Sequence, residues 1–247
     1  MPAAASAAAA EKQTKPTIVL VHGAFADSSS WNGVIPLLQS QGYRVIADAN
    51  PLRGVTSDAA DLSALLKSID GPVVLVGHSY GGSVITNAAE GNPNVKALVY
   101  VAAYAPDAGE SAAKLTSQFP GSTVGTSLSP PVTAPGGKDL YIDPAKFHAE
   151  FAADVPQAQA ALMAAGQRPV TEAALNEASP GAAWKNVPSW FVYGAADKII
   201  PPQAHAFMAQ RAGSKETVAV DGASHVVMVS HPDQVAKVIQ NAANTVG

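Results

Sequence analysis

Short apolar runs alternate with segments of helical periodicity along most of the chain. Six runs are rich in β-branched residues, end at turn residues and are predicted to be strands, at residues 17–21, 43–47, 73–76, 95–101, 189–193 and 216–220. Helices are predicted at residues 30–39, 56–69, 80–90, 201–211 and 232–243. Because the strand runs are continuously apolar rather than alternating, both faces of the sheet are expected to be buried. The pattern predicts an α/β fold, with a mostly parallel sheet of about six strands flanked by helices.

One interval breaks this alternation. Between about residues 106 and 186 we find no convincing strand pattern, and several alanine-rich helical stretches follow a loop at residues 119–137 that is rich in Gly, Pro, Ser and Thr. A loop of that length in a folded domain is often functional. We expect a helical cap, at about residues 106–186, inserted over the carboxyl edge of the sheet within a single domain that spans residues 17–247.

Composition narrows the classes of function. The chain has 247 residues, of which 47% are hydrophobic, so one domain with a large core is expected. Its net charge of −4 gives no basic surface for nucleic acid. The longest apolar stretch, residues 95–105, is too short to span a bilayer, so no membrane insertion is expected. There is no cysteine, which excludes disulfides, a thiolate nucleophile and a cysteine-ligated metal.

The first 16 residues form an alanine-rich segment that we expect to be a disordered tail outside the fold. No basic region or full apolar region precedes the alanines, so the segment is not an intact signal peptide. Two hypotheses about the origin of this segment are equally supported. The alanines are either the remnant of an export signal, which implies a periplasmic or secreted protein, or the tail of a cytoplasmic one. The sequence carries no signal for the oligomeric state.

The pentapeptide Gly77-His78-Ser79-Tyr80-Gly81 follows directly on a predicted strand and precedes a predicted helix. This is the pattern of a nucleophile elbow, in which a sharp strand-to-helix turn lifts a serine hydroxyl out of the sheet. The serine in such a turn has a strained backbone, and only glycine leaves room two residues before and two residues after it. Gly82 adds a second small residue, which allows the helix to pack closely on the sheet. We therefore predict Ser79 to be a catalytic nucleophile.

The base and the acid are expected after the serine in the chain, in the order acid and then histidine. His225 lies in the loop after the last predicted strand, where its imidazole can reach back to the elbow, and we predict it to be the base. The other histidines are less suited because they precede the serine, or lie in the cap, inside a predicted helix or at a helix start: His22, His78, His148, His205 and His231.

The predicted acid is Asp197, in the short loop after the strand at residues 189–193. Its carboxylate would hold the tautomer of the base and stabilise the imidazolium. Asp107, which follows the strand at residues 95–101, is the competing candidate. Asp221 is too close to His225 in the sequence to lie opposite it.

Two backbone amides are needed to stabilise a developing oxyanion. The amide of Tyr80 follows the nucleophile and lies at a helix N-terminus, whose dipole favours negative charge. The second amide should come from the loop after the first strand, where Ala24 is favoured and Phe25 is the second choice. In the same segments, His22 is expected to support the loop and His78 to pack beside the elbow.

At this point the chain resembles the α/β-hydrolase superfamily, and more narrowly the branch of plant methyl-salicylate esterases, hydroxynitrile lyases and their bacterial esterase-like relatives. The segments that carry the resemblance are Val21-His22-Gly23-Ala24, Gly77-His78-Ser79-Tyr80-Gly81-Gly82, Asp197-Lys198 with Pro201, and Ser224-His225. The resemblance extends from residue 17 to the C-terminus and is loose in the cap. It implies a triad of Ser79, His225 and Asp197 with no metal or organic cofactor.

The sequence also departs from the lyases of that branch. They have threonine in place of Gly23 and lysine in place of Val226, so the resemblance favours ester hydrolysis. We expect a serine hydrolase that cleaves carboxylic esters of small to medium, largely apolar substrates through an acyl-enzyme. Phe25, Tyr104 and Val226 are expected to line the substrate pocket together with Tyr80. The alternatives are a hydroxynitrile-lyase-like enzyme and a small-molecule receptor with vestigial hydrolysis.

Overall fold

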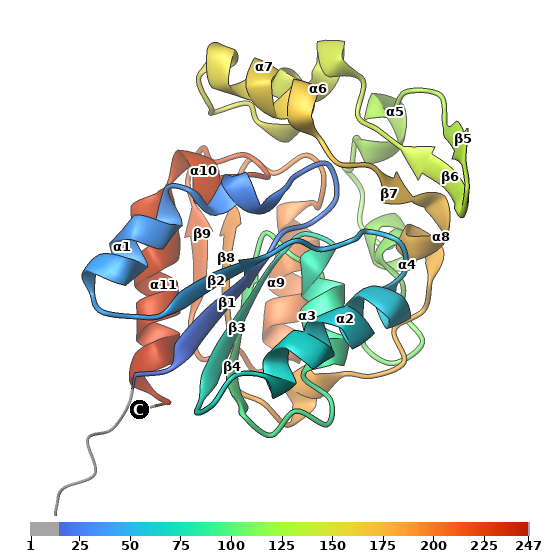
Figure 1. Cartoon of the computed structure of the whole chain (residues 1–247). Coiled ribbons are helices and arrows are strands. Elements are labelled where there is room, and N and C mark those ends of the chain that lie inside the picture. Colours follow the sequence, from blue (N-terminus) through green and yellow to red (C-terminus); the bar gives the residue numbers. More distant parts are fainter. Residues whose placement is uncertain (1–14, 247) are drawn as a thin grey trace, which may run out of the picture.

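A six-stranded sheet forms the centre of the molecule in the computed structural model, which describes residues 15–246 (Figure 1). Its strands are β1 (Thr17–Val21), β2 (Val45–Asp48), β3 (Val73–His78), β4 (Val95–Val101), β8 (Ser189–Gly194) and β9 (Thr217–Val220). They follow the order β2-β1-β3-β4-β8-β9, and every neighbouring pair is parallel. The predicted α/β class and the six strands are confirmed. Most of the predicted tail, residues 1–14, lies outside the described residues.

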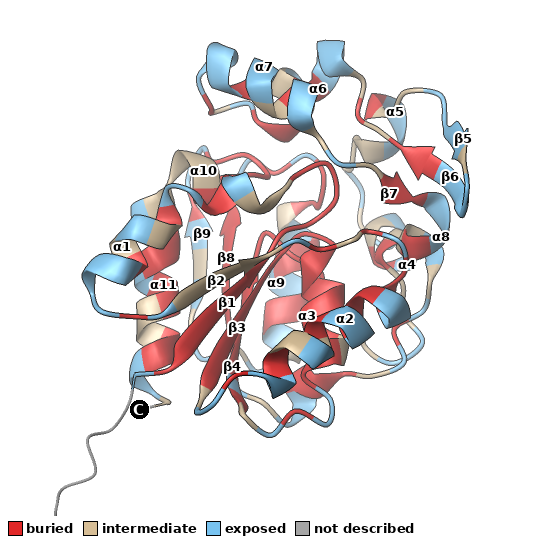
Figure 2. Ribbon diagram, viewed as in Figure 1, coloured by how far each residue is buried: buried red, intermediate tan, exposed pale blue. Residues whose placement is uncertain are grey.

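Helices cover both faces of this sheet (Figure 1). One face carries α1 (Val34–Ser40) and α11 (Pro232–Asn244), and the other carries α2 (Val55–Lys67), α3 (Gly81–Ala88) and α9 (Pro202–Arg211). Every residue of β1, β3 and β8 is buried, which is why these strands read as continuous apolar runs (Figure 2). The strand β2, at the edge of the sheet, is only half-buried.

The main differences in the core concern where helices and strands begin and end. The single helix predicted at residues 30–39 is two elements, the 3₁₀ helix η1 (Ser28–Trp31) and α1, with Gly33 between them. The strand β3 continues to His78, so it leads directly into the turn at Ser79. A short helix, α10 (Val227–Ser230), lies before α11.

The segment predicted to be the cap, residues 106–186, lies in large part over the carboxyl ends of the strands (Figure 1), but its last residues return beside α3, where the amide of Gly181 donates to Asn87. Its helical elements are α4 (Ala112–Ser117), α5 (Val124–Ser127), α6 (Pro144–Phe151), α7 (Gln157–Gly166), α8 (Glu172–Asn176) and the 3₁₀ helix η2 (Ala183–Lys185). It also contains an antiparallel sheet of β5 (Val132–Ala134), β6 (Gly137–Leu140) and β7 (Val170–Thr171).

The prediction that the cap contains no strand is therefore wrong. β5 and β6 form a hairpin in which Ala134 pairs with Gly137 across Pro135 and Gly136. Gly136 has φ 100°, a conformation that favours glycine, so this Pro-Gly pair was a turn signal within the stretch interpreted as a loop. The strands escaped prediction because they are short, and β5 is largely exposed and so has no continuous apolar run.

Close packing of α3 on the sheet gives a first prediction. A Cβ at Gly82 would overlap the carbonyl oxygen of Tyr104 and lie 2.8 Å from the Cβ of Ala103. Gly82→Ala should therefore lower the free energy of unfolding by roughly 1–3 kcal/mol, as overpacking does. Gly166→Ala is the control, because no atom lies within 4 Å of the added Cβ. Urea unfolding measures both variants, and equal losses of stability would show that the contact between α3 and Tyr104 is not tight.

Candidate active site

Ser79 occupies a strained turn between β3 and α3. Its φ of 53° lies in the left-handed region, which costs a non-glycine residue about 1–3 kcal/mol. Both flanking glycines are required by close backbone contacts: a Cβ at Gly77 would lie 2.7 Å from the oxygen of Gly81, and one at Gly81 would lie 2.6 Å from the oxygen of Val21. The local sequence thus produces the sharp elbow that projects the serine from the carboxyl edge of the sheet.

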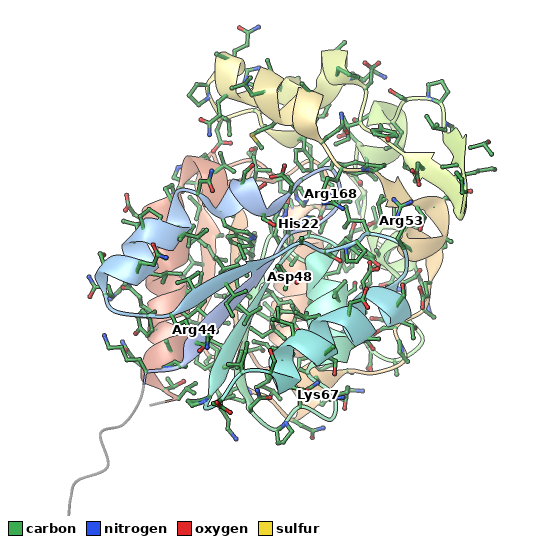
Figure 3. All side chains as sticks on the ribbon, in the orientation of Figure 1. His22, Arg44, Asp48, Arg53, Lys67 and Arg168 are labelled. Atoms are coloured by element: carbon green, nitrogen blue, oxygen red, sulfur yellow. The ribbon has the colours of Figure 1, made fainter. Side chains whose placement is uncertain are left out.

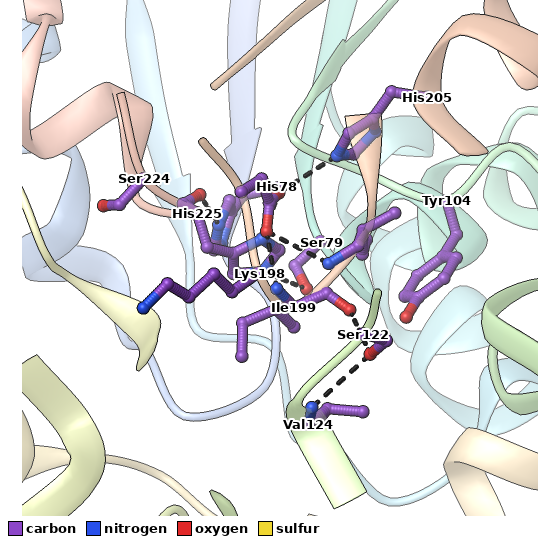
Figure 4. Close-up of polar contacts among 12 residues, drawn as sticks. His78, Ser79, Tyr104, Ser122, Val124, Lys198, Ile199, His205, Ser224 and His225 are labelled. Carbon is purple, nitrogen blue, oxygen red and sulfur yellow. Dashed lines mark hydrogen bonds and ion pairs between the residues drawn. The ribbon is translucent and has the colours of Figure 1, made fainter. Parts of the chain in front are cut away.

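The Ser79 hydroxyl begins an unbroken chain of hydrogen bonds (Figure 4). Its Oγ donates to Nε2 of His225 over 2.9 Å, and Nδ1 of His225 donates to Oδ2 of Asp197 over 2.8 Å. Asp197 follows β8 and His225 follows β9, so three strand ends supply the three side chains. All three residues are at least 95% buried. The structure therefore brings together the three residues that the sequence analysis selected.

The carboxylate of Asp197 accepts four hydrogen bonds. Its Oδ1 accepts the amides of Ile199 at 2.8 Å and Ile200 at 3.0 Å, and its Oδ2 accepts Nε2–H of His205 at 3.0 Å besides His225. Burial alone would raise the pKa of Asp197, but the charge of His225 and the hydrogen bonds from both histidines outweigh burial and hold that pKa below its ordinary value. Asp197 is therefore ionised at neutral pH.

His205 is the residue of this cluster that the sequence analysis missed. We assigned it to the helix at residues 201–211, and it does lie in α9. The helix nevertheless begins directly beyond the loop of Asp197, so its first turns face the carboxylate. The available signal was a histidine one turn inside the helix that follows the acid.

The competing acid, Asp107, does not approach the cluster through its carboxylate. It forms an ion pair with Lys185 over 2.5 Å, and this hydrogen bond lowers the pKa of Asp107. His148 donates from Nε2 to the carbonyl of Val155 within the cap, and His231 lies 3.4 Å from Asp154.

The two candidate oxyanion donors lie beside the nucleophile. Within residues 15–246, the amides of Ala24 and Tyr80 donate no hydrogen bond, whereas the amide of Phe25, the second choice, donates to the carbonyl of Arg168 over 3.0 Å. Figure 3 shows His22 and Arg168 where this loop meets the cap. A Cβ at Gly23 would lie 2.6 Å from the Cβ of Ser79 and 3.1 Å from the amide nitrogen of Tyr80. Only glycine lets the loop approach the elbow so closely.

A cavity of about 480 Å³ opens onto Ser79. Phe25 and Tyr104 line it, whereas Val226 is completely buried and is not among the lining residues. Among residues 15–246, those that line it are all uncharged: Ala24, Phe25, Ser79, Tyr80, Tyr104, Ala112, Ala113, Thr116, Ser117, Phe119, Pro120, Gly121, Ser122, Val124, Gly125, Leu128, Leu175 and Ile199. A second cavity of about 280 Å³, between η1 and α7, shares only Phe25 with the first and does not reach Ser79.

The hydroxyls of the two tyrosines in this cavity are already paired. Tyr80 donates to Asp58 over 2.9 Å, and the hydroxyl of Tyr104 lies 2.7 Å from that of Thr116. The cavity is therefore largely apolar, apart from Ser79 and the small hydroxyls of α4 and its following loop.

Across residues 15–246 no group of three or more His, Cys, Asp or Glu side chains is arranged to hold a metal ion. No helix in that range is long and apolar enough to cross a bilayer.

Comparisons with known proteins agree on one family. The family model of the alpha/beta hydrolase family matches residues 18–238. Alpha-hydroxynitrile lyase of Arabidopsis thaliana is 28% identical over 244 residues, covering 90% of this chain and 95% of its own length. Methylesterase 1 of the same plant is 26% identical over 251 residues, covering 92% and 95%. The crystal structure of polyneuridine aldehyde esterase superposes with a TM-score of 0.80 at 23% identity, over 92% of this chain and 99% of that one. The resemblance predicted from the sequence is confirmed.

Three buried histidines near the site make stability depend on pH. Burial is the main cause that lowers the pKa of His22, His78 and His205 from its ordinary value, and for His78 the pKa falls well below that value. These side chains stay neutral in the folded protein but take up protons in the unfolded chain below about pH 6.5. Unfolding is therefore favoured as the pH falls through that value.

We predict that the free energy of unfolding decreases below about pH 6.5, with a slope of up to about 4 kcal/mol per pH unit for three such groups. His78→Gln keeps an N–H that can donate to the carbonyl of His225, as His78 does over 3.2 Å, but cannot take up a proton. This variant should lose about one third of the slope. Urea unfolding at pH values between about 7.5 and 5 measures this slope for both proteins. A free energy of unfolding that did not depend on pH would contradict the burial of neutral histidines.

Proposed function

The chain belongs to the alpha/beta hydrolase family, and from this premise we propose that it is a serine hydrolase that cleaves carboxylic esters. The observation that carries the proposal is the buried hydrogen-bonded chain from Ser79 through His225 to Asp197, with hydrogen bonds of 2.9 and 2.8 Å. A serine hydroxyl is a poor nucleophile unless a base removes its proton, and this geometry provides the base and the group that orients it.

The reaction would proceed by acyl transfer. Ser79 Oγ attacks the ester carbonyl while His225 Nε2 takes its proton, and Asp197 stabilises the resulting imidazolium. The amides of Ala24 and Tyr80 would bind the oxyanion, each lowering the activation free energy by roughly 3 kcal/mol. When the intermediate collapses, His225 protonates the leaving alcohol and an acyl group remains on Ser79. His225 then takes a proton from water, the hydroxide attacks the acyl carbonyl, and His225 returns the proton to Ser79 as the acid leaves.

The cavity supports uncharged, largely apolar substrates of small to medium size. Its volume of about 480 Å³ is within the ordinary range for small-molecule sites. A charged group placed there would lose its hydration without gaining a partner of opposite charge. The names of methylesterase 1 and polyneuridine aldehyde esterase agree with an ester as the reacting group. An intact triad also favours an enzyme over a receptor with vestigial hydrolysis.

Cyanohydrin cleavage is the second candidate, because a hydroxynitrile lyase is among the relatives. Leaving cyanide carries a negative charge, and none of the described residues that line the cavity can supply a positive one. The lysine that follows the histidine in the related lyases is replaced by Val226, which is buried outside the lining. An alcohol leaving group needs no fixed positive charge because His225 protonates it. The site therefore favours the ester.

Ser79→Ala tests the nucleophile. It should reduce kcat/KM for nitrophenyl esters by at least about 10³-fold, because the triad acts as a unit. It should also abolish labelling by a serine-directed phosphonate. Ser83→Ala is the matched control, since Ser83 lies one turn further along α3 and its buried hydroxyl has no hydrogen-bond partner within residues 15–246. A folded Ser79→Ala protein that retained most of its activity would end the proposal.

The ester and lyase proposals are separated by the two products. We predict measurable hydrolysis of short or aromatic esters, and cyanide release from mandelonitrile no faster than with Ser79→Ala, because none of the cavity-lining residues within 15–246 is a cation. A spectrophotometric cyanide assay run beside an ester assay on the same preparation measures both. Cyanide release that depends on Ser79, without ester turnover, would reverse the assignment.

A further inference from the structure

His205 is a buried side chain at the active site to which the acyl-transfer mechanism gives no step. It lies in α9, has no exposed surface, and donates from Nε2 to Oδ2 of Asp197 over 3.0 Å. That oxygen is the one that accepts Nδ1–H of His225 at 2.8 Å. Figure 4 shows His205 beside the cluster of Ser79, His78 and His225. His205 is not among the residues that line the cavity, so it has no direct route to the substrate.

Asp197 is held on every side by donors. A carboxylate has about four acceptor positions, and here the amides of Ile199 and Ile200 occupy one oxygen while the imidazoles of His205 and His225 occupy the other. If the donor at position 205 were removed, Oδ2 would keep only His225. A buried carboxylate with an empty acceptor position has a higher free energy, and its remaining hydrogen bonds restrict its rotation less. The orientation of Asp197 therefore depends on His205.

The His205 ring is itself held independently of Asp197. It stacks on the ring of Tyr193, with centroids 4.7 Å apart and planes inclined by 20°. Burial is the main cause that lowers its pKa from its ordinary value, although Asp197 acts in the opposite direction, so the ring is neutral at pH 7. Since the carboxylate only accepts, the proton is on Nε2. The titratable groups that act on it are Asp197 and His225, and the buried Tyr193 lies against its face.

We propose that His205 is a positioning residue, which fixes the Asp197 carboxylate for its hydrogen bond to the catalytic base His225. The inference rests on the proposed ester hydrolysis, since positioning is read through that reaction. Two imidazoles share Oδ2, so the hydrogen bond from His205 also takes part of the negative charge that would otherwise act on His225. Without this hydrogen bond, more of the negative charge of Asp197 acts on the imidazolium that forms at His225 during acyl transfer.

Two variants separate positioning from packing. His205→Phe keeps an aromatic ring that can stack on Tyr193 but has no N–H, whereas His205→Gln loses the ring and places an amide N–H near the position of Nε2. For a nitrophenyl ester, His205→Phe should lose kcat on the order of tenfold with KM changed by less than about twofold. The acidic limb of its rate profile between about pH 5 and pH 9 should move to higher pH. His205→Gln should restore most of kcat and the wild-type limb. Circular dichroism and urea unfolding establish that each variant is folded.

If His205 only filled space, His205→Phe would retain more of kcat than His205→Gln, because the phenyl ring fills the site better than glutamine does. Equal kcat and equal pH limbs in the two variants, or a loss confined to KM, would overturn the proposal. If His205→Phe does not fold, His205→Asn, whose shorter amide does not reach Asp197, replaces it in the comparison with His205→Gln.

The positioning role can also be read without a substrate. Absence of ester turnover in the wild-type protein would refute the proposed function alone. NMR titration of the His225 ring then tests positioning by itself: proton uptake at higher pH in His205→Phe than in His205→Gln supports the proposal, and identical titrations refute it.

Discussion

The close approach of backbone at the turn of Ser79 is the constraint on which the site depends. Ser79 has φ 53°, and Gly77, Gly81 and Gly23 each leave space that a Cβ would fill at 2.6 to 2.7 Å from a neighbouring atom. This packing directs the hydroxyl toward His225, and within residues 15–246 it leaves the amides of Tyr80 and Ala24 without a hydrogen-bond acceptor. The strain, of order 1–3 kcal/mol, is supported by strands whose residues are completely buried.

The cap covers the cavity and also forms hydrogen bonds to the loops of the site. It bonds each of the three loops that meet at the elbow: the carbonyl of Arg168 accepts the amide of Phe25, the amide of Thr123 donates to the carbonyl of Lys198, and Asp154 accepts the amide of Ser224. The Phe151 ring of α6 also packs on the His225 ring, with centroids 5.1 Å apart. Residues 106–186 therefore line the cavity that opens onto Ser79 and also hold the loops that carry Phe25, Asp197 and His225.

The sequence predicted what local patterns and chain order determine. Glycines around a serine after a buried strand marked the elbow, and the order of acid and histidine at later strand ends selected Asp197 and His225. The contact of His205 with Asp197 was missed because it depends on which side of the first turn of α9 faces the Asp197 loop. The β5–β6 hairpin was missed because β5 is exposed, and Val226 was expected in the pocket although the turn into α10 directs it into the core. Side-chain direction after a turn depends on packing, which a single sequence does not display.

The central claim is that Ser79 carries the acyl group between the two halves of the reaction. Acid quenching during turnover of a slowly hydrolysed nitrophenyl ester, followed by proteolysis and mass spectrometry, tests this claim most directly. The account predicts one acyl adduct per chain, on the peptide that contains Ser79, which appears with the initial release of nitrophenol and disappears as the ester is consumed. Sustained ester turnover with no adduct on Ser79, or with the adduct on another residue, would contradict it.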